Sequence, residues 1–310
     1  MTEHTAPAPV REGQTMRGAS RLVVYANFVR LPHTVFALPF ALVGVVLASY
    51  VAPVRWVSVF WVVVAFTAAR FAAMGFNRIV DRRIDAKNPR TAMRELPAGK
   101  LSVREASIAV AIASVLFGIA AWQLNPLCLL LAPFALIWVF FYSYTKRFTR
   151  WSHLVLGVGM GIAPAGGYIA VTGQWSHPWW VIPVLVAAVM TWGAGFDVLY
   201  ALQDVRFDRD NRLYSLPATM GARSAVRFAR ALHAATVGLL AIVVSEAAGI
   251  THPGKLSWAG VVAVAALLIY EHSLISEKDQ SKLNAAFFTM NGVISIVFFA
   301  FMLIDRIKQS

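Results

Sequence analysis

Charged side chains are scarce in this chain of 310 residues, because Asp, Glu, Lys and Arg together make up only 14% of it. Soluble domains usually carry about 25% charged residues, and hydrophobic residues here reach 58%, so the composition excludes an ordinary soluble protein. Cysteine is almost absent as well. The one cysteine, Cys128, cannot form an intrachain disulfide. Several apolar stretches exceed the roughly 20 residues that a bilayer-crossing helix needs, which predicts an all-α integral membrane protein.

The start of the sequence lacks an apolar run, so we expect no cleaved signal peptide. The first 20 residues are polar, and we expect a disordered cytoplasmic tail over 1–20 and one membrane domain over 21–310. Apolar stretches that are candidate spans follow at about 28–52, 56–76, 103–124, 126–145, 153–172, 179–201, 224–249, 256–275 and 284–305. We therefore expect a bundle of nine transmembrane helices.

Acidic residues are few, 15 against 28 basic ones, which gives a formal net charge of +13. If the N-terminus is inside the cell, only Arg55, Lys255, Arg306 and Lys308 fall on the outer side. Basic residues concentrate in cytoplasmic loops, so this asymmetry predicts a cytoplasmic N-terminus and an external C-terminus. Membrane topology thus accounts for the charge, and we expect no nucleic-acid partner.

The segment "NRIVDRRID", directly after the second apolar stretch, carries Asn77, Asp81 and Asp85 at intervals of four residues. A helix that continues out of the membrane would put all three on one face. Like charges at this spacing repel each other, so we expect that Asp81→Asn would not lower stability and would even raise it slightly. The alternative is that both aspartates are solvated loop charges that balance Arg82 and Arg83.

The segment "FDVLYALQDVRFD", after the sixth apolar stretch, repeats this arrangement. Asp204 and Asp208 are four residues apart, and Asp197 lies seven before Asp204, so one helix would place all three on a single face. Each acidic cluster precedes a Leu-Pro-Ala tripeptide, at 96–98 and 216–218, in a weak internal repeat. Both clusters fall on the predicted cytoplasmic side, where we expect the two acidic faces to meet.

Several carboxylates on one side of the membrane suit Mg²⁺, which keeps some of its waters and bridges to substrate phosphates. Arg and Lys side chains nearby can bind the remaining phosphate oxygens. We interpret the two acidic faces as a magnesium–diphosphate site at the membrane surface. A transporter would also carry intramembrane acids, but near mid-bilayer. A CDP-alcohol phosphotransferase would carry a D-G-x-x-A-R pattern, which this sequence lacks.

"NRIVDRRID" resembles the first aspartate-rich motif of the UbiA superfamily of intramembrane aromatic prenyltransferases, and "DVLYALQDVRFD" resembles the second. "RTAMRELPAGKLS" and "FYSYTKRFT" are similar to two further cytoplasmic motifs, and the resemblance covers about residues 25–305. It implies a helical bundle with a cytoplasmic cap over the active site and a prenyl tail in a cavity open to lipid. The metal-associated residues that it implies are Asn77, Asp81, Asp85, Asp204 and Asp208. The catalytic residues that it implies are the four aspartates of this set together with Asp197.

The resemblance also implies an activity, which is transfer of a polyprenyl group from its diphosphate to the ring of an aromatic acid in ubiquinone or menaquinone biosynthesis. Mg²⁺ would be the cofactor, with Mn²⁺ as a substitute. The acceptor would be 4-hydroxybenzoate or 1,4-dihydroxy-6-naphthoate, and the start "RLPHTVFALP" departs from the ubiquinone pattern and slightly favours the naphthoate. We expect the inner membrane of a bacterium, the bilayer and the two substrates as partners, and no obligate protein partner.

Five further side chains are candidates for substrate binding: Arg90, Arg94, Lys146, Arg147 and Tyr200. Arg90 and Arg94 would grip a diphosphate together, or would be ordinary membrane-surface charges. Lys146 and Arg147 follow the fourth apolar stretch, where they would bind diphosphate or the acceptor carboxylate, or only anchor the helix. Tyr200 would shelter a carbocation or pack at the membrane interface.

Several other polar residues have roles that the sequence alone does not decide. Arg78 stands where the first motif of the family has an aspartate, and it would face the phosphates or anchor the helix at the surface. His33 would line the acceptor pocket or pack at a helix end. Glu271 is a weak site candidate, because acids inside a membrane tend to be functional. Asn284 and Asn291 share a helix face and are expected to bond between helices.

Overall fold

The computed structural model describes residues 16, 18, 20–31, 34, 37–245, 254–274 and 290–309. Within these ranges the chain is helical and contains no β-strand, which confirms the predicted all-α class for this part of the chain. Most of the predicted tail over 1–20 lies outside the described residues. The helices are α1 (Arg21–Phe28), α2 (Leu38–Ala48), α3 (Trp56–Lys87), α4 (Val103–Leu124), α5 (Pro126–Thr145), α6 (Ser152–Thr172), α7 (Val181–Tyr200), α8 (Val205–Asp210), α9 (Leu216–Met220), α10 (Ala222–Val243), α11 (Lys255–Leu274) and α13 (Asn291–Gln309), with a 3₁₀ segment, η2 (Ala201–Asp204), between α7 and α8.

Polar residues set the ends of the long helices. Ser102 and Glu105 form a reciprocal capping box at the start of α4, which satisfies two free backbone N–H groups there. Asn125 ends α4 and begins α5: its side-chain oxygen accepts from the Cys128 N–H at 2.9 Å, and its amide nitrogen donates to the Ile169 carbonyl at 2.9 Å. One asparagine therefore makes the tight turn and ties it to α6.

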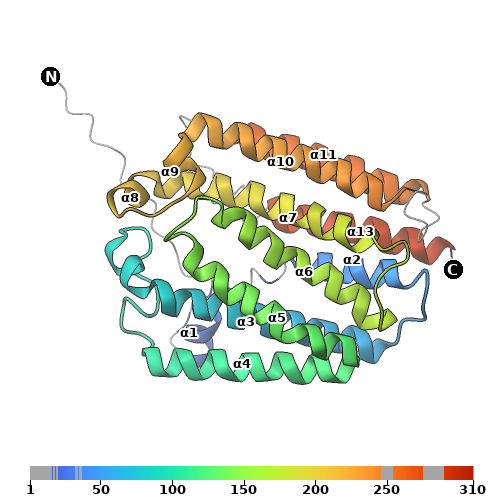
Figure 1. The fold of residues 1–310 in the computed structure, drawn as a ribbon, viewed down its shortest axis with the longest axis horizontal. Helices are drawn as coiled ribbons and strands as arrows, with labels where there is room; N and C mark the ends of the chain where they lie inside the picture. Colours follow the sequence, from blue (N-terminus) through green and yellow to red (C-terminus); the bar gives the residue numbers. More distant parts are fainter. Residues whose placement is uncertain are drawn as a thin grey trace.

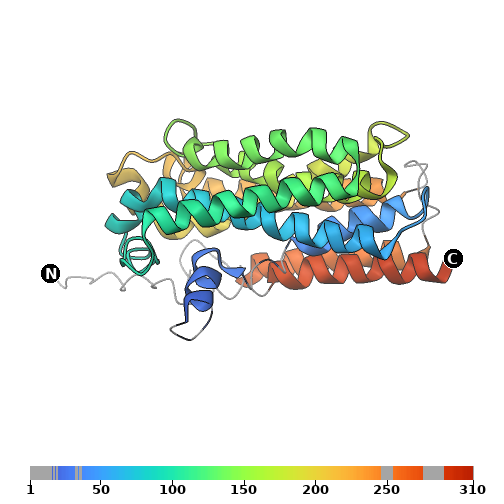
Figure 2. The ribbon, with the colours of Figure 1, turned by 90° about the horizontal axis from the view of Figure 1, so that it is seen from below.

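The long helices run side by side along one axis, with α10 and α11 at one edge of the bundle and α4 at the opposite edge (Figure 1). In the view turned by 90° they form more than one layer (Figure 2). The short helix α2 packs closely on α6 through glycine. A Cβ at Gly44 would lie 2.0 Å from the Pro164 carbonyl oxygen, and one at Gly167 would lie 2.0 Å from that of Ala41, so only glycine permits this approach.

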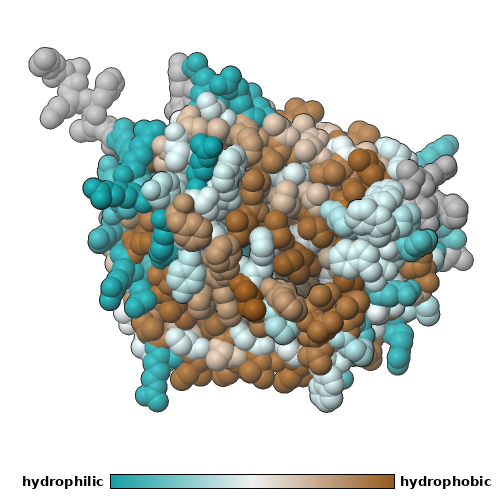
Figure 3. Space-filling view, viewed as in Figure 1, coloured by the Kyte–Doolittle hydropathy of each residue, from teal (hydrophilic) through white to brown (hydrophobic). Residues whose placement is uncertain are grey.

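Seven helices of the described ranges are long and apolar enough to cross a membrane, beginning at Trp56, Val103, Pro126, Ser152, Val181, Ala222 and Lys255. The face shown in Figure 3 agrees, because hydrophobic residues cover most of the middle of the bundle there and hydrophilic ones gather toward its two ends. The span beginning at Trp56 continues as one helix to Lys87, well past the predicted end at 76. The second acidic segment likewise follows its span as a nearly continuous helical run to Asp210.

The prediction of nine spans is not confirmed. The first stretch, 28–52, is not one helix, because α1 ends at Phe28 and α2 has only 11 residues. At 1.5 Å per residue α2 is about 16 Å long, roughly half the thickness of the hydrocarbon core. For the ninth stretch, 284–305, residues 284–289 lie outside the described ranges. The described helix α13 runs on to Gln309 and includes Asp305, Arg306 and Lys308 near its end.

Candidate active site

A cavity of about 180 Å³ lies at the end of the bundle where α3, α5 and α7 finish and α6 begins. The short helices α8 and α9 lie at the same end (Figure 1). Among the described residues its lining is dominated by charge. Five aspartates line it, namely Asp81, Asp85, Asp197, Asp204 and Asp208, and three basic side chains, namely Arg90, Arg94 and Lys146. The two acidic clusters therefore meet in one site, although more than a hundred residues separate them in the chain.

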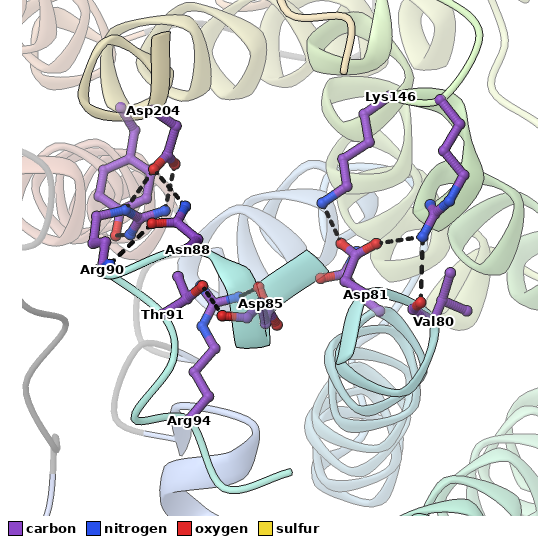
Figure 4. Close-up of polar contacts among 12 residues, drawn as sticks. Val80, Asp81, Asp85, Asn88, Arg90, Thr91, Arg94, Lys146 and Asp204 are labelled. Carbon is purple, nitrogen blue, oxygen red and sulfur yellow. Dashed lines mark hydrogen bonds and ion pairs between the residues drawn. The ribbon is translucent and has the colours of Figure 1, made fainter. Parts of the chain in front are cut away.

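One wall of the cavity is the last part of α3. As predicted, Asn77, Asp81 and Asp85 share a helix face, and the Asn77 side-chain amide donates to Asp81 Oδ2 at 3.3 Å. The Asp81 side chain is only 3% exposed. Its carboxylate accepts from Lys146 Nζ (Figure 4) and, at 2.8 Å, from Arg147 Nη2, and these two residues directly follow α5. The first aspartate is therefore neutralised by two cations.

Asp85, one turn further along α3, has two differently placed oxygens. Oδ1 accepts from Arg94 Nη1 at 2.7 Å, because the chain after α3 turns back across its end (Figure 4). Thr91 reinforces this turn by donating to the Asp85 backbone carbonyl at 3.1 Å. Oδ2 is buried and has no hydrogen-bond partner among the described residues. A buried, unpaired carboxylate oxygen is costly, so it indicates a place where a positive ligand would be stabilised.

The opposite wall comes from the end of α7 and from η2. Arg90 Nε donates to Asp204 Oδ1 at 2.9 Å while its Nη2 donates to Oδ2, a two-pronged contact that suits the flat guanidinium group. Asn88 adds a hydrogen bond to Asp204 Oδ1 at 3.0 Å. Arg90 Nη1 also donates to the Tyr200 hydroxyl at 2.9 Å, and the guanidinium lies 5.1 Å from the centre of that ring. Figure 4 shows Arg90 and Asn88 converging on Asp204.

The two remaining aspartates of the cavity have no Arg or Lys partner among the described residues. Ser215 Oγ donates to Asp208 Oδ2 at 2.7 Å. His153, at the start of α6, lies with Nδ1 2.6 Å from Asp197 Oδ2. Sequence reasoning missed His153, as it missed Asn88, because no local spacing connects either residue to its carboxylate partner.

Arg147 is the one predicted substrate-binding residue outside the lining of the cavity. Its guanidinium bonds the Ser143 carbonyl at 2.6 Å, the Val80 carbonyl at 3.2 Å and Asp81. Arg78 is 4% exposed and does not line the cavity either, so the structure places it neither at the surface nor at the cavity, where its two predicted roles would need it.

Glu271 lies buried in α11, away from the lining of the cavity. Asn291, the first residue of α13, is also buried. His33 and Asn284 lie outside the described residues, so their predicted roles stay predictions.

The donor set fits a hard divalent cation. Carboxylate and amide oxygens are the groups that Mg²⁺ prefers, and Asp85 contributes a buried oxygen without a partner. Within the described part of the chain, no three His, Cys, Asp or Glu side chains are close enough to hold one ion together. The reason is visible in the contacts, since Lys or Arg holds the carboxylates of Asp81, Asp85 and Asp204. A metal would have to draw these oxygens away from the cations.

A membrane-spanning bundle with a cavity of carboxylates and cations at one end defines an intramembrane enzyme for a polyanionic substrate. The chain belongs to the UbiA prenyltransferase family, whose sequence model matches residues 37–293. It is 31% identical over 235 residues to a 4-hydroxybenzoate octaprenyltransferase from Aromatoleum aromaticum, covering 76% of this chain and 77% of that protein.

Two solved structures share the fold. The apo structure of a UbiA homolog from Aeropyrum pernix K1 superposes with a TM-score of 0.80 at 34% identity, covering 89% of this chain and 98% of the other. A UbiA homolog from Archaeoglobus fulgidus bound to DMAPP and Mg²⁺ gives a TM-score of 0.70 at 22% identity, covering 90% and 98%.

Proposed function

We propose that this protein transfers a polyprenyl group from an allylic polyprenyl diphosphate to the ring of an aromatic acid in quinone biosynthesis. The observation that carries the proposal is the single cavity in which two aspartate clusters and three cations meet at one end of a membrane bundle. The name of the Aromatoleum relative favours 4-hydroxybenzoate as acceptor. The naphthoate stays the alternative, because only the start of the first apolar stretch supports it.

Mg²⁺ is the cofactor that the site and the relatives support, since the Archaeoglobus homolog was solved with DMAPP and Mg²⁺. We assign its binding to Asn77, Asp81, Asp85, Asp204 and Asp208, which all line the cavity. When bound, it supplies positive charge that stabilises the leaving diphosphate. Mn²⁺, with the same preference for oxygen ligands, is expected to substitute.

The cations of the cavity have two sets of possible partners. Without substrate, Arg90, Arg94 and Lys146 are paired with aspartates. When a diphosphate and its metal enter, the carboxylates gain a stronger partner, and these side chains can donate to phosphate oxygens instead. Tyr200 keeps Arg90 oriented through its hydroxyl, so the guanidinium remains in the cavity in both arrangements.

The transfer then needs a weakened C–O bond and a nearby ring. The bonding electrons of the C–O bond leave with the diphosphate, whose charge the basic side chains offset. The electron-rich aromatic ring attacks the exposed allylic carbon, and loss of a ring proton restores aromaticity. Tyr142, Tyr200, Phe207 and Tyr214 line the cavity and present aromatic surface, which favours a developing carbocation.

The basic residues support an orientation in the inner membrane with the site and the N-terminus on the cytoplasmic side. In this arrangement α13 and the half-length helix α2 would add to the seven long helices to give the nine segments of the family pattern. The connection over 88–102, with α8 and α9, would form the cytoplasmic cap. Cysteine-accessibility labelling from each side of the membrane would test this orientation.

The direct experiment uses the purified protein in lipid vesicles with Mg²⁺, geranyl diphosphate and either aromatic acid. We expect a ring-prenylated product with 4-hydroxybenzoate or with 1,4-dihydroxy-6-naphthoate. An Asp85→Asn variant is the inactive control, because it removes the negative charge of a carboxylate whose Oδ2 is buried in the site. Failure of the unaltered protein to prenylate either acid would contradict the proposal.

A further inference from the structure

His153 differs from the other polar residues of the cavity because the partners of its two ring nitrogens indicate which nitrogen carries the proton. Its side chain is 5% exposed at the start of α6. Nδ1 lies 2.6 Å from Asp197 Oδ2 on α7, and Nε2 faces the backbone N–H of Leu216, the first residue of α9, at 3.4 Å. A backbone N–H can only donate, so Nε2 is the acceptor and the proton is on Nδ1. In this tautomer the ring donates its Nδ1–H to Asp197.

Asp197 is correspondingly different from the other aspartates. Asp81, Asp85 and Asp204 each have a Lys or Arg partner, whereas the only ion-pair partner of Asp197 within the described ranges is His153. Its side chain is 21% exposed and lines the cavity. One carboxylate oxygen, Oδ2, is held by the imidazole, which leaves Oδ1 for a ligand. An ionised carboxylate without a strong cation beside it is a better proton acceptor than one in a salt bridge.

We propose that His153 is a positioning residue that holds Asp197 as the base for the aromatic substrate. The inference rests on the proposed function. When the ring carbon has bonded to the allylic carbon, that ring carbon still carries its hydrogen. Asp197 takes this proton, the electrons of the C–H bond return to the ring and restore aromaticity, and Asp197 passes the proton to water as the product leaves. The donated Nδ1–H keeps the carboxylate turned toward the ring.

The test compares His153→Ala with His153→Asn, whose amide N–H can take the place of Nδ1–H. We expect His153→Ala to lower kcat by roughly 10- to 100-fold, because a misplaced base loses part of its effect. The KM of the prenyl diphosphate should stay within about twofold, and His153→Asn should recover most of the activity. His177→Ala, at an exposed histidine in the connection between α6 and α7, is the matched control and should not change turnover.

A kinetic isotope effect separates positioning of a base from a loss of structure. With an acceptor deuterated at the attacked ring carbon, proton removal is fast in the unaltered protein and the isotope effect on kcat is about 1. In His153→Ala proton removal becomes rate-limiting, so the isotope effect on kcat should rise clearly above that of the unaltered protein. The double variant that carries Asp197→Asn and His153→Ala should have a kcat close to that of Asp197→Asn alone, since the two residues act as a unit.

The outcomes are distinct. A fall in kcat with no isotope effect in any of the variants would overturn the proposal, and so would full activity of His153→Ala. If the unaltered protein prenylates neither aromatic acid, the proposed function fails instead. This outcome is measured on the unaltered protein and not on the variants, so the two failures are distinguishable.

Discussion

Replacing Asp81 by Asn should destabilise the metal-free protein, and the structure allows the size of the effect to be worked out. The substitution removes the charge that Lys146 and Arg147 share at a carboxylate only 3% exposed. A hydrogen bond to a charged group contributes about 1.5–3 kcal/mol, and breaking a fully buried ion pair costs about 3–5 kcal/mol. Both cations are about one-third exposed and would regain water, so we expect a loss of about 2–4 kcal/mol in the free energy of unfolding.

The measurement is thermal unfolding of the purified protein in detergent with EDTA. By the scaling for soluble proteins, with an unfolding entropy of about 2.1 cal/mol/K per residue, the loss corresponds to a fall in Tm of about 3–6 °C for 310 residues. Asp210→Asn, at an exposed aspartate in α8, is the matched control and should shift Tm by less than about 1 °C. A second check is the pair Asp81→Asn and Lys146→Met, whose combined effect should be smaller than the sum of the two.

An equal or higher Tm for Asp81→Asn would refute this reasoning. It would mean that repulsion between Asp81 and Asp85 outweighs the attraction to the cations, which is what the sequence alone led us to expect. The structure reverses that expectation because each of the two aspartates has a basic partner from outside the helix.

Three further predictions concern activity. Turnover should disappear in EDTA and return with Mg²⁺ or Mn²⁺, since the oxygen ligands suit hard cations; full turnover without metal would contradict the assigned site. Asp204→Asn should lose most prenyl transfer yet still insert and fold, and near-normal turnover at saturating Mg²⁺ would show that the wrong aspartate was assigned. Arg147→Ala distinguishes two roles. A ligand of the acceptor carboxylate would raise the KM of the aromatic acid about 10- to 150-fold, whereas a support of Asp81 would lower kcat and metal affinity. Because Arg147 lies outside the lining of the cavity, we expect the second result.

Helical periodicity made the first acidic face predictable. Asn77, Asp81 and Asp85 lie on one uninterrupted helix, so their spacing alone determined that they share a face. The second cluster was predicted less well. Asp197 and Asp204 were expected on a single helix, but α7 ends at Tyr200 and a 3₁₀ segment carries Asp204. A change of helix type depends on packing and is not visible in residue spacing.

No sequence pattern could predict which residues bind the carboxylates. His153 lies 44 residues from Asp197, and Asn88 lies 116 residues from Asp204. Such contacts are decided by how the helices pack. The same limit explains the first apolar stretch, because composition measures the length of an apolar run and not whether its helix is continuous. The 11-residue helix α2, packed on α6 through Gly44, has the composition of a span without the length of one.

The charge of the cavity lining has a consequence for the order in which ligands bind. Five carboxylates face three cationic side chains among the described lining residues, and Arg147 pairs with Asp81 from outside the lining, so these groups together carry an excess of one negative charge, His153 not counted. A bare diphosphate approaching this surface is repelled, while a divalent cation is attracted. Binding should therefore be ordered, with the metal arriving first or together with the diphosphate. Calorimetric titration with an unreactive prenyl thiodiphosphate should give heat only when Mg²⁺ is present, which would make the free Mg²⁺ concentration on that side of the membrane a condition for loading the enzyme at all.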